Sequence, residues 1–113
     1  MNRKDPEYIF EDKNGAEGTT LTLMKTPAGV LVGEILRDNA GREIENKSYD
    51  ASGNIIRRTA YDWDDQRKPV KTTTWDAKGN LISIHERGKP PIFYGEHQAG
   101  APPFMRADNQ KKP

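Results

Sequence analysis

The sequence contains no cysteine, and this absence excludes several kinds of chemistry. Disulfide bonds, thiol nucleophiles and zinc sites built on thiolates all require that side chain. The chain has 113 residues, a length that suits one domain and excludes a large enzyme architecture. Hydrophobic residues make up 33% of the chain, so we expect a folded domain with a small core.

The chain also lacks an excess of one charge and a long apolar run. Lys and Arg number 18 and Asp and Glu 17, so no net field attracts nucleic acid, which is not an expected partner. No stretch approaches the roughly 18 apolar residues of a transmembrane helix, so we expect no membrane span. The first ten residues contain no apolar signal segment. A cytoplasmic location is expected if Met1 is native, and the location stays open if Met1 replaces a removed signal.

A recurring tetrapeptide with Asp at its first position and Gly at its fourth is the main pattern that is present. The copies are Asp12-Lys-Asn-Gly15, Asp38-Asn-Ala-Gly41, Asp50-Ala-Ser-Gly53 and Asp76-Ala-Lys-Gly79, with variants at Thr26-Pro-Ala-Gly29 and Asp64-Asp-Gln-Arg67. The Asp carboxylate can accept a hydrogen bond from the backbone two residues on, and Gly tolerates the positive φ that follows a type I turn. The pattern predicts hairpin loops of three residues, each with a bulge.

The segments between these turns are rich in Thr, Ile, Val, Tyr and Trp, which is typical of β-strands. We predict an all-β antiparallel meander of six to seven strands over residues 7–88, as an open single sheet or a small up-and-down barrel. An edge strand is expected at residues 7–11. Residues 1–6 are predicted to be a flexible N-terminus, and residues 89–113 a Pro-rich extended or disordered tail.

The turn geometry also predicts which residues face one another, because the Asp lies opposite the residue after Gly. The predicted pairs are Leu36 with Ile44, Tyr49 with Ile55, Ser48 with Ile56, Trp75 with Leu81, and Thr74 with Ile82. Pairs of this kind contribute roughly 0.2 to 1 kcal/mol each, so they help to fix the register.

Alternation along the strands divides the side chains into an aliphatic face and a mixed face. The aliphatic face, predicted to be the core, collects Met24, Val30, Val32, Leu36, Ile44, Ile56, Ala60, Val70, Ile82 and Ile84. The mixed face collects Leu21, Leu23, Leu31, Ile35, Tyr49, Ile55, Tyr61, Trp63, Trp75 and Leu81, together with charged residues and His85. Since an open sheet leaves one face uncovered, the mixed face is the candidate functional surface.

The candidate binding residues come from this mixed face and from the C-terminal segment. They are Tyr49, Tyr61, Trp63, Trp75, Arg57 and Lys71 on the strands, and Ile92, Phe93 and Tyr94 after the double proline. Aromatic rings beside basic groups can form a stacking platform for a ligand. Cross-strand packing beside the turns also accounts for Tyr49, Trp63 and Trp75, and we favour that interpretation.

The sequence offers little for catalysis, because no motif of a known catalytic site is present. His85 is expected on a strand and His97 in the tail. Asp62, Asp64 and Asp65 could supply oxygen ligands to calcium, but we favour a turn role for Asp64 and solvated carboxylates for the other two. We therefore predict no catalytic residue, no metal and no cofactor.

Two segments, Tyr49-Asp-Ala-Ser-Gly-Asn-Ile-Ile56 and Trp75-Asp-Ala-Lys-Gly-Asn-Leu-Ile82, are similar to the Tyr-Asp repeats of bacterial Rhs-type proteins. The resemblance covers about residues 37–87. In that family the repeats form β-sheet shells around a toxic cargo, or surfaces for carbohydrate and protein partners. The chain has few repeats, so the resemblance implies a bacterial β-meander with an interaction role rather than a shell.

The preferred function is a small, non-enzymatic protein–protein interaction module. The sheet face, the edge strands or the C-terminal segment would bind another protein or a second copy of the chain. One alternative is a carbohydrate or small-ligand binder that uses Trp63 and Trp75. The other is a hydrolase of unrecognised type that uses His85 with the cluster from Asp62 to Asp65.

Overall fold

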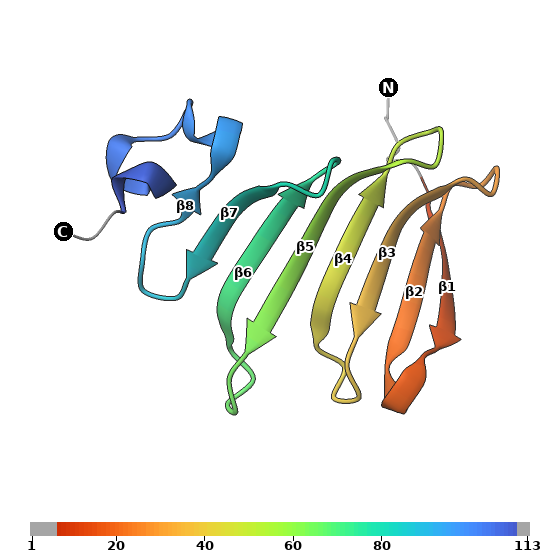
Figure 1. Cartoon of the computed structure of the whole chain (residues 1–113). Coiled ribbons are helices and arrows are strands. Elements are labelled where there is room, and N and C mark those ends of the chain that lie inside the picture. The colour runs from red at the N-terminus through yellow and green to blue at the C-terminus, as the bar shows by residue number, and fades with distance from the viewer. Residues whose placement is uncertain (1–6, 111–113) are drawn as a thin grey trace, which may run out of the picture. The chain divides into compact units, whose positions relative to one another are not determined.

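The computed structural model describes residues 7–110, and over that range the chain is all-β. Figure 1 shows the strands in chain order. They are β1 (Ile9–Asn14), β2 (Thr20–Lys25), β3 (Leu31–Arg37), β4 (Glu43–Tyr49), β5 (Ile55–Trp63), β6 (Pro69–Asp76), β7 (Leu81–Glu86) and β8 (Ile92–Phe93). Four short 3-10 helices complete the described elements: η1 (Ala16–Gly18), η2 (Gly95–Gln98), η3 (Pro103–Met105) and η4 (Ala107–Asn109).

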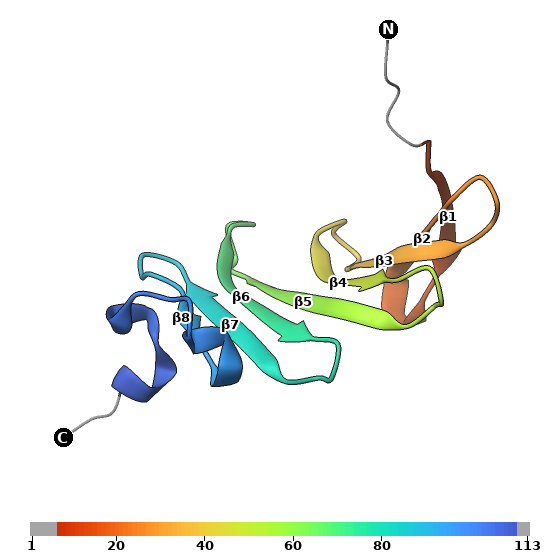
Figure 2. The same cartoon turned by 90° about the horizontal axis from the view of Figure 1, so that it is seen from above.

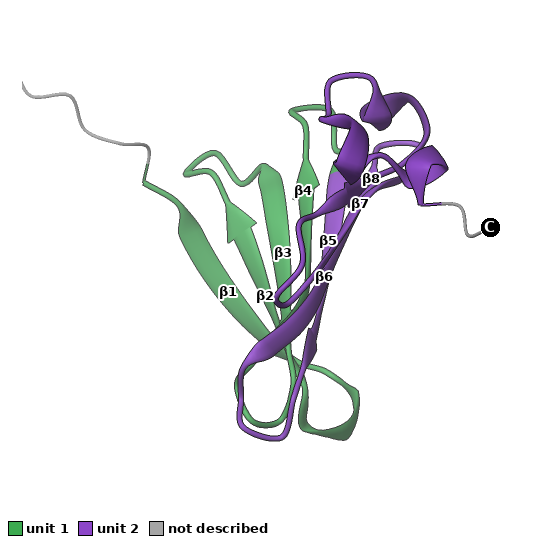
Figure 3. Cartoon of the chain, turned by 90° about the vertical axis from the view of Figure 1, so that its left-hand side faces the viewer, with its two compact units in different colours: residues 1–56 green, residues 57–113 purple. Residues whose placement is uncertain are grey.

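The chain divides into two compact units, residues 1–56 and 57–113 (Figure 3). The first contains β1 to β4, and the second contains most of β5 together with β6 to β8. Within each unit neighbouring strands are antiparallel and their order is the chain order. Each meander is therefore an open sheet. Of the two predicted alternatives, the open sheet is confirmed and the barrel is wrong. The described strands number eight rather than six or seven, because β8 forms a two-residue strand beside β7.

Five of the six predicted hairpin turns are confirmed, and Asp38 shows their geometry. The Gly41 amide donates to the Asp38 carbonyl at 2.9 Å, and the Asp38 amide donates to the Arg42 carbonyl at 2.9 Å. Gly41 has a φ of 83°, the left-handed conformation that glycine adopts without strain. The variant turn at Asp64 has the same form, although Arg67 carries the positive φ of 62° there.

The predicted turn at Asp12 is wrong. Asp12 lies inside β1, where its carboxylate accepts a 2.6 Å hydrogen bond from the hydroxyl of its cross-strand partner Thr22. Gly15 has an extended backbone with a φ of −104°, so it does not supply the left-handed residue that the turn needs. Glu17 and Gly18 take the positive φ values instead, and the chain reverses around η1. The edge strand is accordingly displaced from residues 7–11 to Ile9–Asn14.

The predicted register holds for one residue pair beyond the turn and then shifts by one. The Trp75–Leu81 pair is confirmed, but Thr74 pairs with Ser83 rather than with Ile82. A β-bulge causes the difference, because one residue of the returning strand is skipped and the pairing resumes one position later. The skipped residue is β-branched and aliphatic in four hairpins: Val32, Ile44, Val70 and Ile82. The pairs predicted across the Asp50 turn stay predictions.

The same bulges overturn the predicted division into two faces. Leu36 pairs with Glu45 rather than with Ile44, and on its other side it pairs with Leu21. Paired residues share a face of a sheet, so Leu21 and Leu36 lie together although alternation places them on opposite faces. Strict alternation fails because each bulge inserts one extra residue, and the residues beyond it then point to the opposite face from the one that alternation predicts.

Few described side chains are buried. Among the described residues, Leu23 and Thr22 on β2 and Gly33 on β3 are buried in the first unit, and Ala101 is buried in the second. The hydroxyl of buried Thr22 has hydrogen-bond partners, because it donates to Asp12 and accepts a 2.9 Å hydrogen bond from Arg37. The core of each unit is therefore thin, as the composition predicts.

Residues 89–110, which belong to the predicted extended or disordered tail, contain regular elements. The three C-terminal 3-10 helices follow β8 (Figures 1 and 2). Arg106 connects this segment internally, because its Nε donates to the Ala101 carbonyl at 2.8 Å and its backbone bridges to Phe93. The predictions for residues 1–6 and 111–113 lie outside the described residues.

Candidate functional site

The most exposed apolar surface of the first unit lies along β1. Every residue of this strand is exposed, and Ile9 and Phe10 expose 54% and 60% of their surface. Tyr8, just before the strand, is also exposed. β1 pairs with β2 along one edge, and no other described strand pairs with its second edge. The strand therefore combines free backbone hydrogen-bonding groups with uncovered apolar side chains.

The polar residues of β1 form side-chain contacts with β2. Glu11 forms a 3.1 Å ion pair with Lys25 of β2, and the hydrogen bond from Lys25 lowers the pKa of the Glu11 carboxyl below its usual value. Asp12 accepts from Thr22 in the same pair of strands. These contacts fix the position of β1 on β2, so its apolar residues are presented from an ordered strand.

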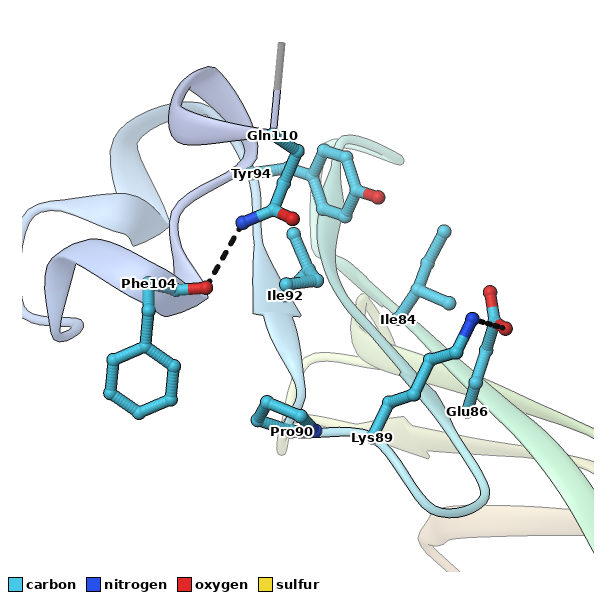
Figure 4. A pocket seen from close by; sticks show the side chains of 8 residues that line it. All are labelled: Ile84, Glu86, Lys89, Pro90, Ile92, Tyr94, Phe104 and Gln110. Atoms are coloured by element: carbon cyan, nitrogen blue, oxygen red, sulfur yellow. Dashed lines mark hydrogen bonds and ion pairs between the residues drawn. The ribbon is translucent and has the colours of Figure 1, made fainter. Parts of the chain in front are cut away.

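The second unit contains a shallow groove between β7, β8 and the C-terminal turns (Figure 4). Its volume is about 290 Å³. Apolar side chains of Ile84, Ile92 and Phe104 line it, and Phe104 is 59% exposed. An ion pair between Lys89 and Glu86, at 3.5 Å, lies at one end. The groove therefore combines apolar contacts with the polar groups of Glu86, Lys89 and Gln110.

The predicted binding residues of the C-terminal segment divide between two faces. Ile92 and Tyr94 line the groove. Phe93, which lies between them in the chain, pairs with Ser83 and points to the opposite face. The structure thus places two of these three residues in one site.

The two tryptophans lie on opposite faces of the second unit, so the prediction of a shared aromatic face is wrong. Trp75 pairs with Arg58, whose guanidinium carbon lies 4.2 Å from the ring centre. Tyr61 is three residues beyond Arg58 on β5 and points to the other face, as does Trp63 two residues further. The bulges explain the error, because they change the alternation between one strand and the next.

The remaining predicted binding residues are also dispersed. Lys71 shares the face of Trp75, whereas Arg57 shares that of Tyr61. Tyr49 belongs to the first unit, where it donates a hydrogen bond to Glu34. Together with the tryptophans, these residues form no single platform within either unit.

The suggested acid–base pair of His85 with the Asp62 to Asp65 cluster is not assembled by the register. His85 pairs with Thr72 on the face of Tyr61, whereas Asp62 pairs with Lys71 on the opposite face. Asp64 is a turn residue, as favoured from the sequence, and accepts from the amides of residues 66 and 68 at 2.8 and 3.0 Å. Its second oxygen accepts from Arg87 at 2.9 Å.

Sequence reasoning missed a cluster formed by Asp76, Glu96 and His97. One ligand atom from each lies within 4.8 Å of the others, and His97 Nε2 is 3.0 Å from Asp76 Oδ2. The hydrogen bond with His97 lowers the pKa of Asp76 below its usual value. Nothing in the spacing of these residues indicates the contact, because it depends on the path of the segment after β8. The adjacent Glu96-His97 pair was the available signal.

No protein-family model matches the chain, and no curated protein is detectably similar to it. Over residues 7–110, no helix is long and apolar enough to cross a membrane.

Proposed function

We propose that the protein is a small, non-enzymatic interaction module that binds another protein through the free edge of β1. The observation that carries the proposal is the exposure of Ile9 and Phe10 on a strand with one unpaired edge among the described strands. An incoming extended segment would add a strand there, with main-chain hydrogen bonds along the edge and apolar contacts on both faces.

The energetics favour this surface over a charged one. Burying an apolar side chain of this size contributes about 1.5 to 3 kcal/mol, so Ile9 and Phe10 together can anchor a partner. The net charge of +1 supplies little long-range attraction. Affinity would depend on the fit along β1, with Glu11 and Lys25 keeping the strand in place.

The resemblance to Rhs-type repeats supports an interaction role in a bacterial protein. Asp50 with Gly53 and Asp76 with Gly79, which carry the resemblance, occupy hairpin turns. They build the scaffold and leave binding to other surfaces. Strand addition at β1 does not require the groove that contains Ile92 and Tyr94, which belongs to the second unit. Carbohydrate binding is less favoured, because that alternative uses Trp63 and Trp75 together and the register places them on opposite faces.

A crosslinking experiment tests the proposal with the full chain. A photo-crosslinking residue at position 8, where the exposed Tyr8 lies just before β1, should capture one partner from the source cells at near-stoichiometric yield. The double variant Ile9→Asp/Phe10→Asp should lower the affinity for that partner about tenfold or more, since each tenfold step corresponds to about 1.4 kcal/mol. Phe104→Asp is the matched control, because Phe104 is equally exposed but lies in the groove.

The outcomes show whether another protein or a second copy of the chain binds the free edge of β1. Loss of capture in the β1 variant and not in the Phe104 variant supports strand addition at β1. A dimer in light scattering that the β1 variant abolishes identifies a second copy as the occupant. A chain that remains monomeric and captures the same material with or without Ile9 and Phe10 overturns the proposal.

A further inference from the structure

We propose that Asp76, Glu96 and His97 form a binding site for a divalent transition-metal ion, with Zn²⁺ as the best fit. The three side chains offer one imidazole nitrogen and two carboxylate oxygens within 4.8 Å of one another. Imidazole nitrogen is a preferred ligand of zinc, and carboxylate oxygens complete many of its sites.

The distances match a site that needs little rearrangement. His97 Nε2 and Asp76 Oδ2 are 3.0 Å apart. Two ligand atoms of a tetrahedral zinc ion, each about 2.0 to 2.1 Å from the metal, lie roughly 3.3 Å apart. The ion would replace the hydrogen bond between them, and Nε2 would present its lone pair with the ring proton on Nδ1.

Asp76 is oriented for this role by the turn that it begins. Its Oδ1 accepts hydrogen bonds from the amides of Lys78 and Asn80, both at 2.9 Å, so the carboxylate is fixed and Oδ2 faces His97. Hydrogen bonds to a ligating group hold it in position and commonly change metal affinity 10- to 100-fold. The turn chemistry that shapes the hairpin also positions one ligand.

The site is open on one side. Asp76, Glu96 and His97 line a cavity of about 470 Å³, and Glu96 is exposed. Water can therefore occupy the coordination positions that the protein leaves free. Lys78 lines the same cavity, and its positive charge opposes cation binding, so it should lower the affinity of the site.

Metal binding would connect two segments of the second unit. Asp76 ends β6, whereas Glu96 and His97 belong to η2 after β8. An ion held by all three would fix η2 to the β6–β7 hairpin. Because a ligand that binds the folded chain stabilises it, the melting temperature should rise with Zn²⁺.

Zn²⁺ titration of the full, tag-free chain by calorimetry tests the site, together with visible absorption of bound Co²⁺. We expect one site and a rise in melting temperature, with little competition from Ca²⁺, which favours six to eight oxygen ligands. His97→Gln and Asp76→Asn should each weaken binding about tenfold or more. Asn at position 76 keeps the acceptor for the turn amides, so circular dichroism should be unchanged.

The controls are His85→Gln and Asp64→Asn, which alter the second histidine and an equivalent turn aspartate. Binding that is lost in the His97 and Asp76 variants and kept in these controls supports the site. The inference is overturned if Zn²⁺ fails to bind, if His85→Gln weakens it as much as His97→Gln, or if Ca²⁺ competes equally. None of these results depends on the β1 surface.

Discussion

Tyr49 shows how a single side chain can respond to its surroundings on an exposed sheet. Its phenol donates a hydrogen bond to the Glu34 carboxylate across β3 and β4. Partial burial, that hydrogen bond and the charges of Glu34 and Glu45 together raise the pKa of Tyr49 to about 12. A neutral phenol is favoured in the folded chain, because an ionised one would lie beside a carboxylate.

Replacing Tyr49 by Phe should lower the free energy of unfolding by about 1 kcal/mol, the usual net value of one hydrogen bond. The loss should be visible in urea unfolding at pH 7. Since the folded pKa is raised, this stabilisation is present below the unfolded pKa near 10 and is lost as the pH rises through about 12. Ultraviolet titration should show one tyrosine ionising later than the others, and a variant that retains this late phase would contradict the assignment.

At the scale of elements, the hairpin turns determine where strands begin and end. Each turn needs one residue with positive φ, which glycine supplies in most of them. Gly79 has a φ of 84° and nothing within 4 Å of the position of a Cβ. Its role is therefore purely conformational, and a side chain there would be strained without meeting a neighbour.

Gly79→Ala should destabilise the chain by about 1 kcal/mol, the lower end of the cost of a left-handed conformation with a side chain. Gly100 provides the control, because it has space for a Cβ and no positive φ. Gly100→Ala should be neutral or stabilising by about 0.4 to 1 kcal/mol. Thermal unfolding compares the two, and equal effects would contradict the conformational explanation.

The strands and most turns were predictable from the sequence, because the Asp-x-x-Gly pattern is a local signal. The division of side chains between the two faces of the sheet was not predictable, because the pairing skips one residue after each of four turns. The skipped residues are Val32, Ile44, Val70 and Ile82. A β-branched aliphatic residue three positions after the turn Gly, or after Arg67, is the sequence signal that could have revealed the shift. The turn predicted at Asp12 was wrong for a different reason, because a cross-strand hydrogen bond with Thr22 outweighed the tendency of Asp12 to begin a turn.

The candidate sites depend on contacts between segments far apart in the sequence, so local patterns identified them only in part. Ile92 and Tyr94 were predicted as binding residues and do line a groove. Trp63 and Trp75 were predicted to act together, yet the register separates them. The contact of His97 with Asp76 spans 21 residues and follows from the course of η2, which no turn or alternation pattern encodes.

For the whole molecule, the turn carboxylates make stability depend on pH. Hydrogen bonds from the backbone amide of Arg42 and from its side chain lower the pKa of Asp38. The Lys68 amide and the Arg87 guanidinium do the same for Asp64 in the other unit. Because the folded pKa values lie below the unfolded value near 3.9, these carboxylates stabilise the folded chain above that pH. The contribution disappears as the pH falls through the folded pKa values.

We therefore expect the urea midpoint to be nearly constant from about pH 7 to 5 and to fall steeply below about pH 4. The double variant Asp38→Asn/Asp64→Asn should fold at neutral pH with a lower midpoint, because asparagine keeps the acceptor for the turn amides but loses the charge. Its midpoint should also fall less steeply below pH 4, since two of the groups that gain protons on unfolding are absent. If the variant shows the same acid slope as the natural chain, the turn carboxylates are not responsible for the pH dependence, and other carboxyl groups must account for it.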